Sequence, residues 1–160
     1  MPTTDSLIDA FLNVTASLRA AVSDMSRDQL TARPVAGKWS TLDVVAHLAD
    51  SDQAWCHRMK RVISEERPLL IGYDESGFTA ALGYADRDIA FELDLIDAQR
   101  RQMAAALRSL PESAWDRTGV HNERGLVALR EMVVIETEHV THHVRTIVEK
   151  RRALGLSEIS

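Results

Sequence analysis

Two histidines in this sequence have the spacing that a shared metal ion requires. His139 and His143 are four residues apart, so on a helix they lie about 40° apart on one face, one turn from each other. Two imidazoles arranged in this way can bind one cation, each nitrogen being about 2.0–2.1 Å from a zinc ion. His142 points to another side of the same helix and is expected to face solvent. The pair predicts a metal site or, in the structural alternative, a hydrogen-bonded patch of half-buried polar side chains.

A third ligand must come from another segment, and His47 is the best candidate for it. His47 lies at the border of the apolar face of its predicted helix, a position that permits a ligand without requiring one. Asp43 and Asp50 lie four residues before it and three residues after it. Either carboxylate could accept a hydrogen bond from the His47 ring and so fix which nitrogen faces a metal.

Two known metal motifs use similar residues, and the sequence departs from both. A zincin requires His-Glu-x-x-His, but Val140 follows His139, so the glutamate that acts as general base is missing. A di-iron bundle needs two Glu-x-x-His motifs. Glu136 and His139 supply one, and no other histidine follows a glutamate by three positions. Glu136 is left as a hydrogen-bond partner of a ligand or as a fourth ligand.

Helices must position these residues, because four segments carry apolar residues at helical spacing and no segment longer than a few residues alternates as a strand does. The predicted helices cover about residues 7–25, 41–66, 89–110 and 126–154. Ser40 and Asp43 form a possible capping box at the start of the second helix. Four amphipathic helices of similar length can bury their apolar faces against one another. The predicted fold class is therefore all-α, a four-helix bundle.

The connections differ in length, and the one between the second and third helices is long. Residues 67–86 form this link, and a connection of that length in a compact domain is often functional. Tyr73, Asp74 and Glu75 within it could overhang a pocket. The chain of 160 residues is predicted to form one domain, residues 1–160, around a single core.

Composition and charge exclude several classes of function. The net charge is −5 and aromatic residues make up 5% of the chain, so the protein lacks both the basic field and the stacking platforms that nucleic-acid binding uses. No apolar run approaches the ~20 residues of a membrane span, and the first residues do not resemble a signal peptide. The single cysteine, Cys56, excludes an internal disulfide and suits a reducing compartment. We expect a cytoplasmic protein that binds neither nucleic acid nor membranes.

Two motifs resemble those of the DinB/YfiT-like superfamily, and the likeness covers nearly the whole chain. The first is Gly-Lys-Trp-Ser at residues 37–40 followed by Asp-Val-Val-Ala-His-Leu-Ala-Asp at residues 43–50, and the second is Glu-His-Val-Thr-His-His at residues 138–143. The resemblance implies a four-helix bundle with up-down-down-up topology, often as a homodimer. It also implies one divalent metal ion held by three histidines, which correspond here to His47, His139 and His143.

The implied metal site suggests a chemistry. Three imidazoles leave at least one coordination position open, as catalytic sites do, and zinc or nickel is expected ahead of iron or manganese. The resemblance implies either hydrolysis or a transfer or isomerisation that uses a low-molecular-weight thiol such as mycothiol or bacillithiol. We therefore expect a metal-dependent enzyme that acts on a small electrophilic substrate. The alternatives are a non-catalytic metal-binding or stress-associated dimeric interaction protein, and a helical dimerisation module without metal.

No motif identifies the catalytic groups. Glu136 and Asp50 are candidates for a base, although each is equally able to orient a ligand. Cys56 lies on an apolar face, where a structural thiol is expected rather than a nucleophile.

The remaining polar residues are interpreted as ordinary surface or loop. His57 and His121 are predicted to face solvent or lie in loops. Arg100, Arg101 and the basic residues 150–152 are interpreted as solvated charge.

Overall fold

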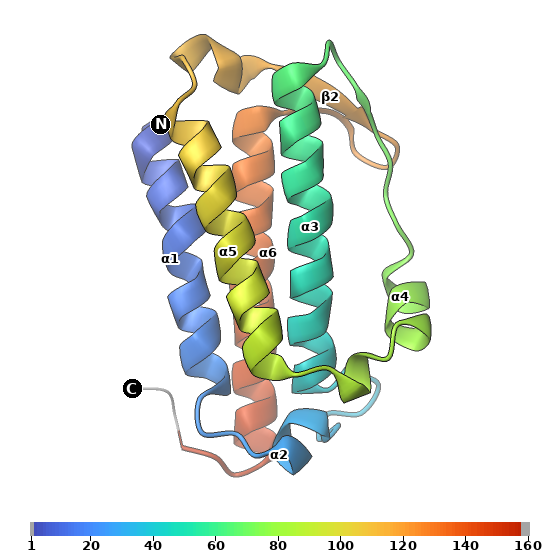
Figure 1. The fold of residues 1–160 in the computed structure, drawn as a ribbon. Helices are drawn as coiled ribbons and strands as arrows, with labels where there is room; N and C mark the ends of the chain where they lie inside the picture. The colour runs from blue at the N-terminus through green and yellow to red at the C-terminus, as the bar shows by residue number, and fades with distance from the viewer. Residues whose placement is uncertain (1, 158–160) are drawn as a thin grey trace.

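Four long helices pack side by side in the computed structural model, which describes residues 2–157 (Figure 1). They are α1 (Thr4–Val22), α3 (Thr41–Ser64), α5 (Ile89–Arg108) and α6 (Leu129–Ala153). Helix α1 packs against α5 and α6, and α3 packs against the same two helices. Helices α1 and α6 run in one direction and α3 and α5 in the other. The predicted all-α bundle with up-down-down-up topology is confirmed.

Side-chain caps determine where the helices begin. The predicted capping box of α3 is present, because the Ser40 Oγ accepts a hydrogen bond from the Asp43 N–H at 3.0 Å and the Asp43 carboxylate accepts one from the Ser40 N–H at 3.0 Å. The Asp88 carboxylate likewise accepts hydrogen bonds from two N–H groups in the first turn of α5. Such caps satisfy N–H groups that have no partner within their own helix.

The apolar faces of the helices meet in two clusters along the bundle. One cluster contains Phe11, Met59 and Met103, and the other contains Leu18 and Leu48, all of them fully buried. Both clusters draw on α1, α3, α5 and α6. Burial of this apolar surface is the main free-energy term that holds the helices together.

The connections contain short elements that were not predicted from the sequence. They are α2 (Arg27–Thr31), β1 (Leu69–Leu70), α4 (Glu75–Ala81), η1 (Tyr84–Asp86), η2 (Glu112–Asp116), β2 (Thr118–His121) and β3 (Gly125–Ala128). The strands form one sheet in the order β1-β2-β3, in which β1 is parallel and β3 antiparallel to β2. Helix α6 begins at Leu129 rather than at residue 126, because the intervening residues pair with β2.

The sheet lies close to the end of α3, and one glycine allows this approach. A Cβ atom at Gly119 would lie 2.6 Å from Cδ1 of Leu70 and 3.0 Å from Cγ2 of Val62. Both neighbours are fully buried, so a side chain at residue 119 would push β2 away from β1 and from α3.

The prediction of solvated charge is wrong at three positions. Arg100 is fully buried and forms an ion pair with Asp52 at 2.7 Å. Lys150 and Arg151 are 2% and 6% exposed. Arg151 donates hydrogen bonds to backbone oxygens at the end of α1, including that of Ser23 at 2.9 Å. Long basic side chains can reach a polar partner from inside a core, so their charge alone does not place them at the surface.

None of the helices between residues 2 and 157 is both long enough and apolar enough to cross a bilayer.

Candidate metal centre

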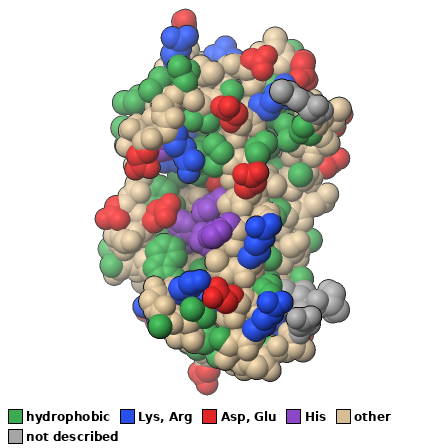
Figure 2. Space-filling view, turned by 180° about the vertical axis from the view of Figure 1, so that it is seen from behind, with side chains coloured by type: hydrophobic (Ala, Val, Ile, Leu, Met, Phe, Trp, Pro, Cys, Tyr) green, Lys and Arg blue, Asp and Glu red, His purple; other side chains and the backbone are tan. Residues whose placement is uncertain are grey.

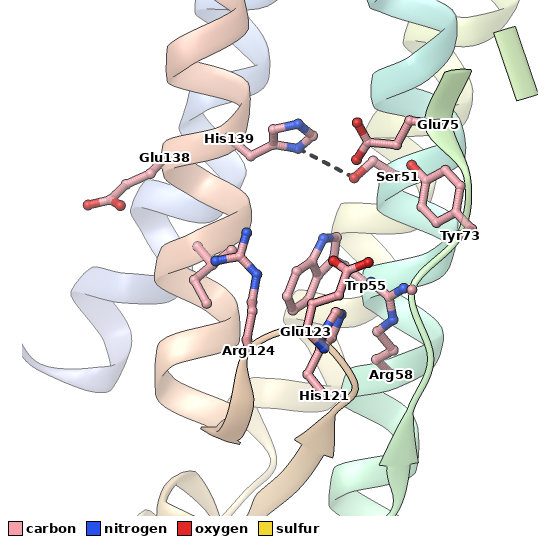
Figure 3. A pocket seen from close by; sticks show the side chains of 12 residues that line it. Ser51, Trp55, Arg58, Tyr73, Glu75, His121, Glu123, Arg124, Glu138 and His139 are labelled. Carbon is pink, nitrogen blue, oxygen red and sulfur yellow. Dashed lines mark hydrogen bonds between the residues drawn. The ribbon is translucent and has the colours of Figure 1, made fainter. Parts of the chain in front are cut away.

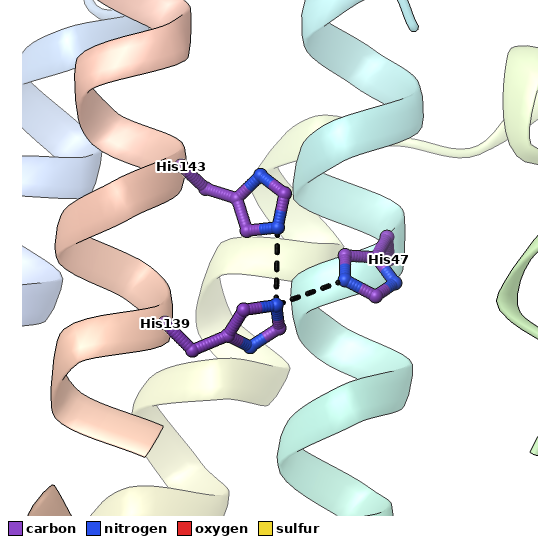
Figure 4. Close-up of side chains that lie close together, drawn as sticks. All are labelled: His47, His139 and His143. Carbon is purple, nitrogen blue, oxygen red and sulfur yellow. Dashed lines mark hydrogen bonds between the residues drawn. The ribbon is translucent and has the colours of Figure 1, made fainter. Parts of the chain in front are cut away.

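Three imidazole rings face one another between α3 and α6 (Figure 4). Nε2 of His139 lies 3.1 Å from Nε2 of His47 and 3.0 Å from Nε2 of His143. One nitrogen from each ring lies within 4.8 Å of the other two. Two nitrogens bound to one tetrahedral zinc ion are roughly 3.3 Å apart, because each is about 2 Å from the metal. The observed spacing suits a single cation.

The hydrogen-bonding of the three rings also favours a bound cation. A contact between two Nε2 atoms is a hydrogen bond only when one of them carries the proton, and Nε2 of His139 faces two such atoms. The Nδ1 atoms of His47 and His143 are buried and have no hydrogen-bond partner among the residues described. A cation that accepted three Nε2 lone pairs would replace these conflicting contacts with three bonds of one kind.

Burial keeps the three rings neutral, which is the form that binds metal. It lowers the pKa of His47 to about 4, with a further contribution from His139. Burial is also the largest cause that lowers the pKa of His139 and of His143. Desolvation disfavours the charged imidazolium, so protons do not compete strongly with a cation at neutral pH.

Two side chains contact the other nitrogen of His139. Nδ1 lies 3.4 Å from the Ser51 hydroxyl and 3.4 Å from a carboxylate oxygen of Glu136. Glu136 is fully buried, which raises its pKa to about 7. The structure therefore places Glu136 behind the ring as a partner of Nδ1, and not among the three Nε2 atoms where a fourth ligand would lie.

The predicted partners of His47 do not contact it. Asp43 caps the first turn of α3. Asp50 accepts a hydrogen bond from the Tyr84 hydroxyl at 2.6 Å and pairs with Arg87 at 3.1 Å. The prediction of these two aspartates as ring partners is wrong, because each is held by other residues and Nδ1 of His47 has no hydrogen-bond partner among the residues described.

A pocket of about 290 Å³ opens beside His139 (Figure 3). Its walls come from α3, the long link, the β2–β3 hairpin and α6, and they include Ser51, Trp55, Arg58, Gly72, Tyr73, Glu75, His121, Glu123, Arg124, Ile135, Glu138 and His139. Tyr73 and Glu75 border the pocket, as expected for the long link. Asp74 does not, because its carboxylate accepts a hydrogen bond from the Gly77 N–H at the start of α4.

A second hollow, of about 300 Å³, borders the other side of the cluster. It contacts His143, and also Trp39, whose ring centroid is 5.2 Å from that of His47. From the side opposite to Figure 1, histidine side chains are visible in a depression of the surface (Figure 2). His142 is exposed beside it, as predicted. His139 and His143 therefore each border a hollow that opens to solvent, whereas His47 is buried between them and α3.

Two side chains of the pocket were misjudged or missed in the sequence. His121 is 4% exposed on β2 and stacks on Trp55 with ring centroids 5.9 Å apart, so its prediction as a solvent-facing or loop residue is wrong. Arg58 is a pocket residue that the sequence analysis does not predict. Helical spacing could have identified it, because Ser51, Trp55 and Arg58 follow His47 at steps of four, four and three residues and so share one face of α3.

Two other interpretations agree with the structure. Cys56 is buried, and burial raises the pKa of its thiol to about 12, so it is a structural residue as expected. His57 is exposed.

Comparison with known proteins gives a consistent result. Residues 10–147 match the family model of the DinB superfamily. A relative from Oceanobacillus iheyensis, provisionally named a metal-dependent hydrolase, is 32% identical over 130 residues, which are 81% of this chain and 75% of the relative. YfiT from Bacillus subtilis carries the same provisional name and is 29% identical over 154 residues, which are 96% of this chain and 86% of YfiT.

Solved structures share the fold. The structure of YfiT, described as an unusual four-helix bundle, superposes with a TM-score of 0.90 at 29% identity and covers 96% of this chain and 89% of its own. A mycothiol-dependent maleylpyruvate isomerase superposes with a TM-score of 0.74 at 15% identity and covers 91% of this chain and 61% of its own. At that identity the second likeness shows the fold alone.

Proposed function

The chain belongs to the DinB superfamily, and from this premise we propose that it is a metal-dependent enzyme that acts on a small electrophilic substrate. The observation that carries the proposal is the convergence of three Nε2 atoms beside a pocket of about 290 Å³. A site with a structural role only would be enclosed by protein. Here one of the three rings, that of His139, forms part of the pocket wall.

We assign His47, His139 and His143 as the ligands of one divalent ion, each through Nε2. Imidazole suits several transition metals, and zinc and nickel are the first to test. A divalent ion bound there would act as a Lewis acid, lowering the pKa of a bound water or thiol and polarising the substrate.

Other residues of the chain hold the His139 ring and the substrate in position. Ser51 and Glu136 contact Nδ1 of His139 and hold its ring with Nε2 turned toward the other two histidines. Tyr73 borders the pocket beside Ser51, and burial raises its pKa, so its hydroxyl stays protonated and can donate a hydrogen bond to a substrate oxygen.

Glu75 is the candidate for a base, in place of Asp50 and Glu136. Its carboxylate lies on the wall of the pocket that faces His139 (Figure 3), and its charge acts on both His47 and His139. Asp50 does not border this pocket, and Glu136 is fully buried behind His139. An exposed carboxylate can accept a proton from a nucleophile and release it to water.

Two nucleophiles suit the proposed site. Water would make the reaction a hydrolysis, in line with the provisional names of the relatives. A low-molecular-weight thiol would make it a transfer, and this possibility is worth testing because an isomerase of the same fold depends on mycothiol. The relatives favour water as the first candidate.

One experiment separates an enzyme from a scaffold. Untagged protein is loaded with zinc or nickel and incubated with 4-nitrophenyl esters, and separately with 1-chloro-2,4-dinitrobenzene and a bacterial thiol. We expect at least one rate that exceeds the rates of metal-free protein and of His139→Ala, while His142→Ala keeps it. If no substrate class gives such a rate, the alternative of a non-catalytic metal-binding or interaction protein is favoured. Sedimentation velocity on the same samples tests the proposed homodimer.

A further inference from the structure

Arg58 is a buried cation without an anionic partner. Its side chain lies on α3, and the residue is 6% exposed. Within residues 2–157 no carboxylate oxygen lies within 4.0 Å of its guanidinium, and its one hydrogen bond runs from Nη2 to the Ile71 oxygen at 2.6 Å. Arg100, by contrast, is buried against Asp52 at 2.7 Å. A buried charge is costly unless it is paired, so Arg58, which borders the pocket, is a candidate to bind an anionic ligand.

A second donor borders the same pocket as Arg58. Nδ1 of His121 accepts a hydrogen bond from the Glu123 N–H at 3.2 Å, which places the proton of the neutral ring on Nε2. No acceptor for this Nε2–H is found in the part of the chain that the structure describes. Arg58 and His121 both pack on Trp55, with the guanidinium carbon 5.0 Å and the imidazole centroid 5.9 Å from its ring. One aromatic side chain thus holds two donors in place.

Among the residues described, the acidic side chains of the pocket form no ion pair with Arg58. Glu75, Glu123 and Glu138 also line the pocket, but all three are exposed, so water and salt screen their charges. Burial is the largest cause that lowers the pKa of His121, and the Arg58 charge lowers it further, while the Glu123 charge acts in the opposite direction. The pocket therefore combines a buried guanidinium and an imidazole N–H donor with three exposed glutamates.

We propose that the substrate or cosubstrate carries a carboxylate or a similar anionic group, which Arg58 and His121 bind while the reacting end lies at the three histidines. This inference rests on the proposed metal-dependent function. Arg58 follows His47 by 11 residues, so their Cα atoms are about 16 Å apart along α3. The two side chains span part of this distance, and the ligand spans the rest. The ligand is therefore elongated, with its anionic end away from the reacting end.

A matched pair of probes tests the anionic group. The probes are 6-mercaptohexanoate and 6-mercapto-1-hexanol, which have the same chain and thiol and differ in the carboxylate. Binding to the zinc-loaded and metal-free full chain is measured by calorimetry and by NMR. We expect the zinc-loaded protein to bind the acid about tenfold more tightly than the alcohol, because hydrogen bonds to charged groups are the strong ones. In the metal-free protein both probes bind more weakly, and the preference for the acid remains.

Variants locate the anion site. Arg58→Gln is expected to reduce the preference for the acid to less than twofold, and Arg58→Lys to keep part of it, which separates loss of charge from loss of fold. Arg61→Gln is the matched control, because Arg61 lies on the same helix, borders the neighbouring groove instead of this pocket and is paired with Glu65 at 2.7 Å. It is expected to keep the full preference.

Three results would overturn the inference: equal binding of the two probes to the wild-type protein, an unchanged preference in Arg58→Gln, or loss of the preference in Arg61→Gln. NMR adds a readout that a structural role of Arg58 would not give, since the acid and not the alcohol should raise the pKa of His121. If the protein binds neither zinc nor nickel, the proposed function fails. In that case, the preference of the metal-free protein for the acid still tests whether Arg58 and His121 bind an anionic group.

Discussion

Two polar clusters lie inside the same bundle, and they differ in whether their hydrogen bonds are complete. Arg100 donates to both carboxylate oxygens of Asp52 at 2.7 Å and to the Phe11 oxygen at 2.8 Å, and it is fully buried. The histidine cluster has two buried Nδ1 atoms without partners and borders two hollows. A closed and satisfied network holds the helices in register, whereas the open one borders the hollows and is the candidate site for a ligand.

Glu136 connects the two clusters. One of its carboxylate oxygens lies 3.6 Å from Nη2 of Arg100 and 3.4 Å from Nδ1 of His139. Asp52 and Glu136 both face Arg100, and burial raises the pKa of each to about 7. One guanidinium therefore serves two carboxylates, which we expect to share a proton near neutral pH. The position of His139 thus depends on a network that contributes to stability.

Removing Arg100 from the closed cluster that it forms with Asp52 should have the largest effect, and this effect is on stability. Arg100→Met leaves Asp52 without its buried counter-charge, so the free energy of unfolding is expected to fall by about 3–5 kcal/mol. Urea unfolding followed by circular dichroism measures this change. Arg101→Met, at the exposed neighbouring position, should change stability by no more than about 0.5 kcal/mol. A loss below about 1 kcal/mol for Arg100→Met would mean that the closed cluster does not hold the bundle together.

Removing a ligand from the open cluster should abolish metal binding and leave the fold intact. His139→Ala is expected to lower the affinity for zinc by at least a hundredfold, about 2.7 kcal/mol, while the stability of the metal-free protein changes little. Elemental analysis and a competitive chelator titration measure this loss. His142→Ala is the matched control because its ring is exposed. Equal metal loss in both variants would contradict the assignment of the inward-facing rings as ligands.

A smaller effect is expected from the residue that joins the clusters. Glu136→Gln weakens the hold on Nδ1 of His139 without removing a ligand, so zinc affinity should fall about tenfold. The same titration measures it, with Ser51→Ala as the comparison for the other partner of Nδ1. If Glu136→Gln lost metal as completely as His139→Ala, Glu136 would have to be a ligand itself.

The smallest effect is expected from substitution of Cys56. Burial raises the pKa of Cys56 to about 12, so at pH 8 only roughly one thiol in ten thousand is the reactive thiolate. Native protein should react with iodoacetamide more than a hundredfold more slowly than urea-unfolded protein, as followed by mass spectrometry. Cys56→Ala should keep zinc affinity within twofold. Rapid alkylation of native Cys56 that also blocks activity would assign the thiol to the chemistry.

The sequence was informative where spacing along one helix determines geometry. The helical periodicity predicted the four long helices, and the Ser40–Asp43 box predicted the start of α3. The step of four residues placed His139 and His143 on one face, and the structure brings His47 to them from α3. Each of these features depends on local conformation together with one helix packing contact.

Features that depend on distant partners could not be predicted in the same way. Strand β1 has two residues, and their partners in β2 lie 51 positions further along the chain, so neither strand shows a pattern of its own. Arg100 occupies a place in an apolar series, and only the position of Asp52 on another helix shows that its charge is compensated in the core. His121 became a pocket residue because β2 carries it onto Trp55.

The outer wall of the pocket is built by segments that do not belong to the four long helices. Gly72 is held by the Asn122 side chain at 2.7 Å, and the link that carries Tyr73 and Glu75 is fastened at its other end where Tyr84 meets Asp50. Insertions or substitutions between these two attachments would reshape the cavity without moving an imidazole. Such changes would alter which reactant the pocket accepts and would leave the proposed ion site in place.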